Sequence, residues 1–327
     1  MSKPLIIKGF GFIGELLEAI EIKGVIDNRY EIIELIGSGG LGRVFKAKDL
    51  ETKEFVALKF LHESLITNER LLGFFHRELL ITSSFKHKNI ICFKAGHFEP
   101  PLCYLVNDYV DGWNGFQFLG KTGKVPPLVA LSICVDLLQG LDYLHLHDVI
   151  HSDLSISNIM IDKTGRVQLA DFGLSFDTAI ENYKDKQFGT PGYISPEHIS
   201  YSKISEQSDL YCVGLIFWQL VTGEKFLTGK KDNKINLQQM KKRDLSKLSD
   251  LKDKGLRKGL KSIFKKSLSY HKFFRYKSAQ QMLIDCYKLM KENNVDYPRY
   301  AIWQYLDDKA LASQTFQKEK QNIYGVK

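Results

Sequence analysis

The first residues of this chain whose types and spacing could do chemistry are the glycines of residues 37–44, which read GSGGLGRV and follow the pattern G-x-G-x-x-G-x-V. Glycine has no Cβ, so the backbone of such a loop can approach phosphate groups closely. A dinucleotide-binding loop has similar glycine spacing but opens a helix, whereas the strand-like residues 44–48 follow this loop. The pattern therefore favours a hairpin that lies over the phosphates of a nucleotide.

A lysine that could bind phosphate comes next along the chain. Lys59 ends a predicted strand that contains Val56 and Ala57. A compact ammonium group can pair with the α- and β-phosphates of a nucleotide, provided that a carboxylate holds it in place. Glu78, on the predicted helix that follows, is the expected partner. An isolated exposed lysine is the alternative, which the V-A-x-K setting disfavours.

Two further motifs carry carboxylates and an amide. Residues 151–158 read HSDLSISN and residues 171–173 read DFG, so the chain matches H-x-D-x-x-x-x-N and D-F-G in that order. On these motifs, together with the glycine loop and V-A-L-K, the chain resembles the eukaryotic-type Ser/Thr protein-kinase family over roughly residues 30–290. Its glycine-loop and hinge residues favour a bacterial soluble member.

The resemblance assigns catalytic roles, with ATP and Mg²⁺ as cofactors. Asp153 accepts or orients the proton of the substrate hydroxyl, and Thr190 hydrogen-bonds Asp153. Lys59 and Glu78 form the ion pair at the phosphates. His151 is expected to pack rather than to act as a general base.

The resemblance also implies which residues bind the cofactors. Asn158 and Asp171 are the implied Mg²⁺ ligands, because they offer oxygen atoms to a hard cation. Asn107 takes the gatekeeper position before the hinge. The implied nucleotide contacts, from the glycine loop, the hinge and the walls of the adenine site, are Gly37, Gly39, Gly42, Val44, Ala57, Lys59, Asp108, Val110, Asn114 and Met160.

Residues 189–197, which read GTPGYISPE, resemble the end of the activation segment of Ser/Thr kinases. The resemblance implies a buried ion pair between Glu197 and Arg275, with Arg275 on a late helix. It also implies that Asp209, near the start of a central helix, holds the backbone of the catalytic loop. The likeness of residues 189–197 to an activation segment favours protein substrates over small molecules.

Two serines depart from the family pattern. Ser152 replaces the arginine that usually binds a phosphorylated activation loop, so activity is expected not to require phosphorylation of that loop. Ser155 replaces a lysine that contacts the γ-phosphate, and Arg43 or Lys186 are candidates to supply the missing charge. Loss of such a contact commonly costs on the order of 10²–10³ in rate. Two alternatives therefore stay open: a weakly active or pseudokinase ATP-binding scaffold, and a small-molecule phosphotransferase.

The elements that must position these residues fall into a strand-rich first part and a helix-rich second part. Strands are predicted over residues 31–36, 43–48 and 54–60, and helices over residues 68–84 and 127–145. The predicted fold class is α+β, a bilobal kinase fold with an antiparallel sheet and one helix in the small N-lobe and a larger, mainly helical C-lobe. The expected divisions are an N-terminal extension (1–29), a kinase domain (30–290, with N-lobe 30–106, hinge 107–112 and C-lobe 113–290) and a C-terminal tail (291–327).

Composition is that of an ordinary globular protein. The 327 residues carry a formal net charge of +8, and the excess is concentrated in residues 230–266, where a solvated surface is a commoner explanation than nucleic-acid binding. Five scattered cysteines fit a reducing compartment, and the apolar run 210–221 contains Gln219 and is too short to span a bilayer. We expect a cytoplasmic protein with protein substrates, no nucleic-acid partner and no transmembrane segment. Homodimerisation or partner docking through the termini stays open.

Overall fold

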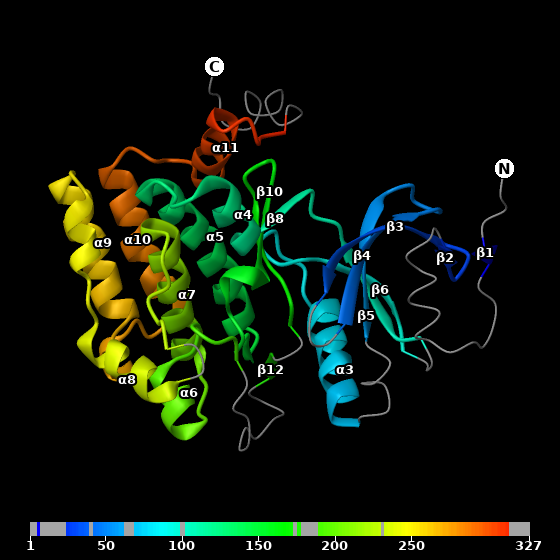
Figure 1. Ribbon diagram of the computed structural model, residues 1–327, viewed down its shortest axis with the longest axis horizontal. Coiled ribbons are helices and arrows are strands. Elements are labelled where there is room, and N and C mark those ends of the chain that lie inside the picture. The colour runs from blue at the N-terminus through cyan, green and yellow to red at the C-terminus, as the bar shows by residue number, and fades with distance from the viewer. Residues whose placement is uncertain are drawn as a thin grey trace. The chain divides into compact units, whose positions relative to one another are not determined.

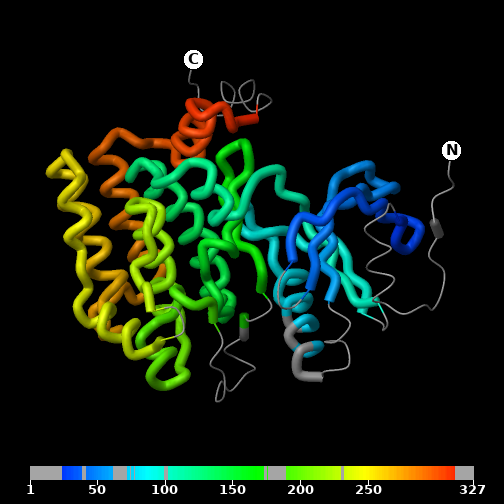
Figure 2. Tube along the Cα trace, viewed as in Figure 1, coloured from blue at the N-terminus to red at the C-terminus, as the bar shows by residue number. Residues whose placement is uncertain are grey.

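The structure is a computed structural model that describes residues 5–6, 24–38, 42–61, 69–98, 102–172, 175–177, 189–229 and 232–313 (Figure 1). Figure 2 traces the same chain, with the other residues in grey. Apolar residues at helical spacing also predict an amphipathic helix over residues 12–20, which lies outside the described part. The chain divides into two compact units, unit 1 (Met1–Lys86 and Ile91–Val110) and unit 2 (His87–Ile90 and Asp111–Lys327).

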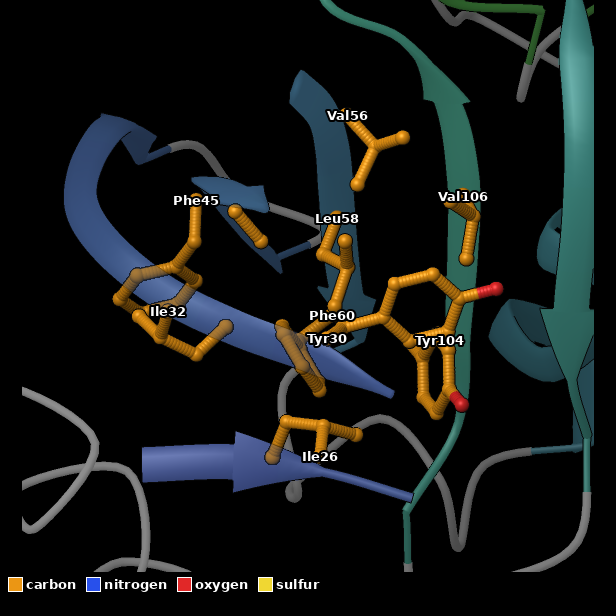
Figure 3. Close-up of a cluster of buried hydrophobic side chains, with 10 residues drawn as sticks. Ile26, Tyr30, Ile32, Phe45, Val56, Leu58, Phe60, Tyr104 and Val106 are labelled. Atoms are coloured by element: carbon orange, nitrogen blue, oxygen red, sulfur yellow. The ribbon is translucent and has the colours of Figure 1, made fainter. Parts of the chain in front are cut away.

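Unit 1 is built on an antiparallel sheet whose buried face is its core. Along β5, Val56, Leu58 and Phe60 are buried while the residues between them are half-buried, which is the alternation that a pleated strand produces. Figure 3 shows these side chains packed with Phe45 and Tyr104. In the described part the strand order is β1-β2-β3-β4-β5-β7-β6, with β1 parallel to β2 and the other pairs antiparallel. The strands are β1 (Leu5–Ile6), β2 (Gly24–Ile26), β3 (Tyr30–Ser38), β4 (Gly42–Asp49), β5 (Phe55–Leu61), β6 (Phe93–His97) and β7 (Tyr104–Asp108).

In the described part of unit 1, one helix, α3 (Glu69–Ser84), packs beside the sheet. Phe75 of α3 is buried with Leu61, Cys103 and Leu105 in a second apolar cluster. Each of these residues is less than a twentieth exposed. This packing fixes the face of α3 that carries Glu78.

Unit 2 is organised around one long, buried helix, α5 (Pro127–His145). It is nearly as apolar as a membrane span, and among the described residues it is the helix that has the length and composition to cross a bilayer. However, 72% of its most apolar window is buried inside the fold, and the core helix of a globular protein passes the same test. Its neighbours include α7, α10 and α11. Among its described residues, the α-helices of unit 2 are α4 (Gly115–Thr122), α5, α6 (Pro196–Tyr201), α7 (Glu206–Thr222), α8 (Asn233–Lys242), α9 (Lys254–Ser267), α10 (Ala279–Glu292) and α11 (Pro298–Asp308).

Unit 2 also contains short strands that the sequence did not predict. In its described part, β8 (Gly112–Asn114), β10 (Ile159–Asp162) and β11 (Val167–Leu169) form one antiparallel sheet, and β9 (Val149–Ile150) pairs with β12 (Phe176–Asp177). These pairs fix both ends of the catalytic motif at residues 151–158.

The last described helix, α11, packs on the turn between β10 and β11. Arg299 donates to the carbonyl and hydroxyl oxygens of Thr164, at 3.2 and 2.6 Å. A Cβ on Gly165, which has φ +79°, would lie 2.5 Å from the carbonyl oxygen of Arg299. Trp303 is 2% exposed. Aromatic residues of the predicted tail therefore pack on the helical unit.

A buried carboxyl on α5 makes the stability of unit 2 depend on pH. Burial raises the pKa of Asp136 to about 6. The Val167 amide donates to Asp136 Oδ2 at a long 3.4 Å. The nearby Oδ1 of Asn89 is buried without a hydrogen-bond partner among the described residues. The folded state therefore binds a proton on Asp136 more tightly than the unfolded chain does.

We expect Asp136→Asn to stabilise the protein at neutral pH. The contribution of Asp136 favours folding below its unfolded pKa and is lost as pH rises through about 6. A neutral amide avoids the cost of a buried charge, which is about 2–3 kcal/mol for a shift of this size. Thermal melting between about pH 4 and 8 should show that the variant lacks the decline in Tm that the native protein shows across this window. Parallel pH profiles for the two proteins would contradict the assignment.

Candidate active site

In unit 1, the predicted lysine–glutamate pair is formed. Lys59 Nζ lies 2.9 and 2.7 Å from Glu78 Oε1 and Oε2, and their side chains are 12% and 4% exposed. The hydroxyl of Thr82, one turn further along α3, donates to the Glu78 carbonyl oxygen at 2.6 Å. Such a partly buried pair holds the ammonium group in one place, which is what a phosphate ligand requires.

The residues assigned to the nucleotide in unit 1 lie on the side of the sheet opposite its core. Val44 is the cross-strand partner of Lys59, and Ala57 precedes Lys59 by two residues. All three are half-buried, so the pleat places them on one face. The register thus makes the three residues neighbours on this face.

Two of the three motif glycines lie in the described part, and Gly39 lies outside it. A Cβ on Gly42 would lie 1.8 Å from the carbonyl oxygen of Phe60, so close pairing of β4 with β5 requires glycine there. A Cβ on Gly37 would meet Val44 at an ordinary 3.7 Å. Sterically, Gly42 is thus needed by the fold itself, a role that its place in a phosphate-loop motif did not reveal.

The hinge residues begin at the end of β7. The amide of Asp108 donates to the carbonyl oxygen of Cys92 at 2.9 Å, and its carboxylate lies 3.2 Å from Lys94. Asn107 is paired with Ala57 across the sheet, and its Oδ1 is buried without a hydrogen-bond partner among the described residues. Val110 is the last residue of unit 1.

In unit 2, the carboxylate of Asp153 is held in place by Thr190. The amide and the hydroxyl of Thr190 both donate to Asp153 Oδ1, each at 2.8 Å. Burial raises the pKa of the Asp153 carboxyl above its ordinary value, and the charge of Asp171 adds to this effect. A raised pKa makes a carboxylate a better proton acceptor.

Asp209 fixes the backbone of the loop that carries Asp153, as the resemblance implied. Its two carboxylate oxygens accept from the amides of His151 and Ser152, at 2.9 and 3.0 Å. His145 Nε2 lies 2.9 Å from Asp209 Oδ2 and is a member of this group that sequence reasoning missed. His151 is fully buried, with its ring 5.1 Å from that of Phe172. His151 therefore packs, as predicted.

Asn158 and Asp171 offer the oxygen atoms that suit Mg²⁺. Asn158 Nδ2 donates to the Asp153 carbonyl oxygen at 2.8 Å, so Oδ1 is the atom of this amide available to a cation. Asp171 is exposed and has φ +64°. In the described part, no group of three or more His, Cys, Asp or Glu side chains could hold a metal ion. Mg²⁺ fits, because it often takes one or two protein oxygens and completes its shell with phosphates and waters.

Met160 and Asn114, the nucleotide contacts assigned to unit 2, are cross-strand partners in β10 and β8. The two residues therefore lie beside each other, next to the turn that holds Asn158. The side-chain oxygen of Asn114 accepts from the Gln117 amide at 2.8 Å and caps α4. This structural role for Asn114 was not predicted.

Ser155 is buried and does not take over the role of the lysine it replaces. It is 1% exposed, and its hydroxyl has no hydrogen-bond partner among the described residues. We expect Ser155→Ala to change kcat/KM by less than about threefold, far below the 10²–10³ that loss of a transition-state contact costs. Urea unfolding should show that the variant is at least as stable as the native protein, because the substitution removes a buried hydroxyl that has no hydrogen-bond partner among the described residues. A large fall in kcat/KM would show that the hydroxyl does contact the reacting groups.

Glu197 and Arg275 form the predicted ion pair, at 2.7 Å. One expectation was wrong: Arg275 is not on a helix but follows the short 3-10 helix Lys272–Phe274 in extended conformation. The extended backbone lets its guanidinium group also donate to the carbonyl oxygens of Ser269 and Gln207, at 2.7 and 3.1 Å.

A strand-rich unit with a lysine–glutamate pair and a helical unit with the Asp153 loop define the α+β, bilobal protein-kinase fold. Residues 30–289 match the protein kinase domain family. Because this match covers most of the chain, the protein belongs to the protein kinase family.

Among curated proteins, the chain is similar to bacterial Ser/Thr kinases. It is 25% identical over 307 residues to the serine/threonine-protein kinase PrkC of Bacillus subtilis, covering 90% of this chain and 47% of PrkC. It is 29% identical over 281 residues to the serine/threonine-protein kinase PknB of Mycobacterium tuberculosis, covering 84% and 44%. The probable serine/threonine-protein kinase CPE1738 of Clostridium perfringens is 25% identical over 273 residues, covering 83% and 40%. The matches thus span less than half the length of these relatives.

Proposed function

We propose that this chain is an ATP- and Mg²⁺-dependent protein kinase that transfers the γ-phosphate to serine or threonine side chains of protein substrates. The observation that carries the proposal is the double hydrogen bond from Thr190 to Asp153, which joins the activation segment to the catalytic loop. The names of PrkC and PknB, both serine/threonine-protein kinases, support the same acceptor class.

The proposal gives each residue a role that its geometry supports. Asp153, oriented by Thr190, accepts the proton of the acceptor hydroxyl as the oxygen attacks phosphorus. Lys59, held by Glu78, pairs with the phosphates of ATP. Asn158 and Asp171 would hold Mg²⁺, which neutralises phosphate charge when bound.

The remaining contacts of the proposal are those to the adenine and the loop. The nucleotide is assigned to the glycine loop, to the faces of Val44, Ala57 and Met160, and to the hinge backbone at Asp108 and Val110. The cytoplasm is our proposed location, because all five cysteines are free, as expected in a reducing compartment.

Incubation with radiolabelled ATP, Mg²⁺ and a generic basic protein tests the activity. We expect label on serine and threonine, and none when EDTA removes the metal or when Asp171 is replaced by asparagine. Binding of Mg²⁺–ATP without transfer to any protein would instead support a pseudokinase scaffold. The buried Ser155, which leaves its loop position without a cation, is the observation that favours this second candidate.

A further inference from the structure

The positive charge of this protein is concentrated in one segment of unit 2. Residues 230–266 contain fourteen lysines and arginines against four aspartates and no glutamate, a net charge of +10, whereas the whole chain has +8. The rest of the protein is therefore slightly acidic. Solubility alone does not require this separation, because a surface with both signs of charge interspersed is enough to keep a protein in solution.

Within this segment, four cations lie on one face of α9. Lys254, Arg257, Lys258 and Lys261 follow one another at helix positions i, i+3, i+4 and i+7, so their side chains neighbour each other. Leu260 and the other apolar residues of α9 are buried on the opposite face. Figure 1 shows α9 at an edge of unit 2, away from β10 and β12 of the catalytic region.

These four cations line a cavity instead of a flat surface. Its volume is about 510 Å³, and its remaining lining residues are Leu245, Ser246, Leu248 and Ser249, so no carboxylate contributes to the wall. Arg257 Nη1 donates to the Ser249 carbonyl oxygen at 3.1 Å, which fixes one cation at the wall. The cavity thus combines cations, hydroxyl groups and a small apolar floor.

The arrangement costs stability when nothing is bound. Like charges at i+3 and i+4 destabilise a helix by roughly 0.2–0.5 kcal/mol per pair. Lys254 also lies at the N-terminal end of α9, where the helix dipole disfavours a cation. Nearby lysines are paired, Lys247 with Glu224 and Lys266 with Asp285, but Lys254, Lys258 and Lys261 form no ion pair with a described residue.

We propose that this cavity is a binding site for a compact ligand that carries two or more phosphate groups. The phosphate charges of such a ligand repel one another. Several cations within one cavity neutralise these charges better than one or two surface lysines would. The site lies apart from the catalytic loop, and it does not depend on the proposed phosphotransfer.

The test measures binding of inorganic tripolyphosphate to the full chain by calorimetry, in the presence of EDTA. Lys258→Ala/Lys261→Ala removes two exposed cations of the cavity. Lys234→Ala/Lys265→Ala, the matched control, removes two exposed cations of the same basic segment that do not line it. A second arm measures sedimentation with phosphatidylcholine vesicles that contain or lack cardiolipin, a lipid with two phosphates.

We expect tripolyphosphate affinity to fall at least about tenfold in Lys258→Ala/Lys261→Ala and to change less than about twofold in the control, with binding weakened by salt. Binding to cardiolipin vesicles alone, with the same difference between variants, would also support the site and identify a lipid headgroup as the source. Equal losses in both variants, or no binding in either arm, would overturn the proposal. Circular dichroism of both variants confirms that α9 is retained.

Discussion

Replacement of Asp153 by asparagine is expected to lower kcat by about 10²–10⁴, the usual contribution of a positioned proton acceptor. The asparagine oxygen can still accept from the amide and hydroxyl of Thr190, which now contact Oδ1 at 2.8 Å. The loop should therefore keep its shape while the basic oxygen is lost. Steady-state kinetics with a protein substrate measures the effect.

The controls separate chemistry from binding. The KM for ATP should change less than about threefold, because Asp153 is not an assigned nucleotide contact and its loss removes an interaction made in the transition state. Thr190→Val removes the hydroxyl that orients Asp153 and should lower kcat by a smaller factor, whereas Thr190→Ser should restore it. If Asp153→Asn keeps a kcat near that of the native protein, Asp153 is not the proton acceptor.

The parts of the fold that the sequence predicted are those with long periodic patterns. Residues 127–145 were predicted as a helix and form α5, and the strand predicted over residues 54–60 largely coincides with β5. The three-residue strands β8 and β11 were missed, because so short a segment shows no alternation. Their pairing depends on partners far away, as between Asn114 and Met160.

The candidate site shows the same limit. Motifs identified the polar residues that meet, such as Asp153 with Thr190 and Lys59 with Glu78. His145 was missed because its partner, Asp209, is 64 residues away and a buried polar pair leaves no periodic signal. The burial of Ser155 could not be predicted either. Its residue type showed that the lysine of the family pattern is missing, but not where the serine hydroxyl lies.

The largest loss of stability is expected from Arg275→Met. The Arg275 side chain is fully buried, donates two hydrogen bonds to Glu197 at 2.8 and 2.7 Å, and lies 4.6 Å from the centroid of the Tyr211 ring. Removal of one partner of such a pair leaves a buried charge without compensation, which costs about 3–5 kcal/mol. Urea unfolding should show this decrease. Arg243→Met, which removes an exposed bond to the Lys265 carbonyl oxygen, should cost less than about 1 kcal/mol.

The pH dependence of the Arg275→Met variant identifies the cause. Burial alone would raise the pKa of Glu197, but Arg275, together with the hydrogen bond from Ser208, lowers it overall, so this pair contributes stability at neutral pH that is lost on acidification through that pKa. Without Arg275, burial should raise the pKa of Glu197, and protonation then removes the uncompensated charge. The variant should therefore lie closer to the native protein in stability at about pH 5 than at pH 7.5, and Glu197→Gln in the same variant should recover part of the loss at neutral pH. A loss that is independent of pH and unaffected by Glu197→Gln would instead point to packing on Tyr211 as the main contribution of Arg275.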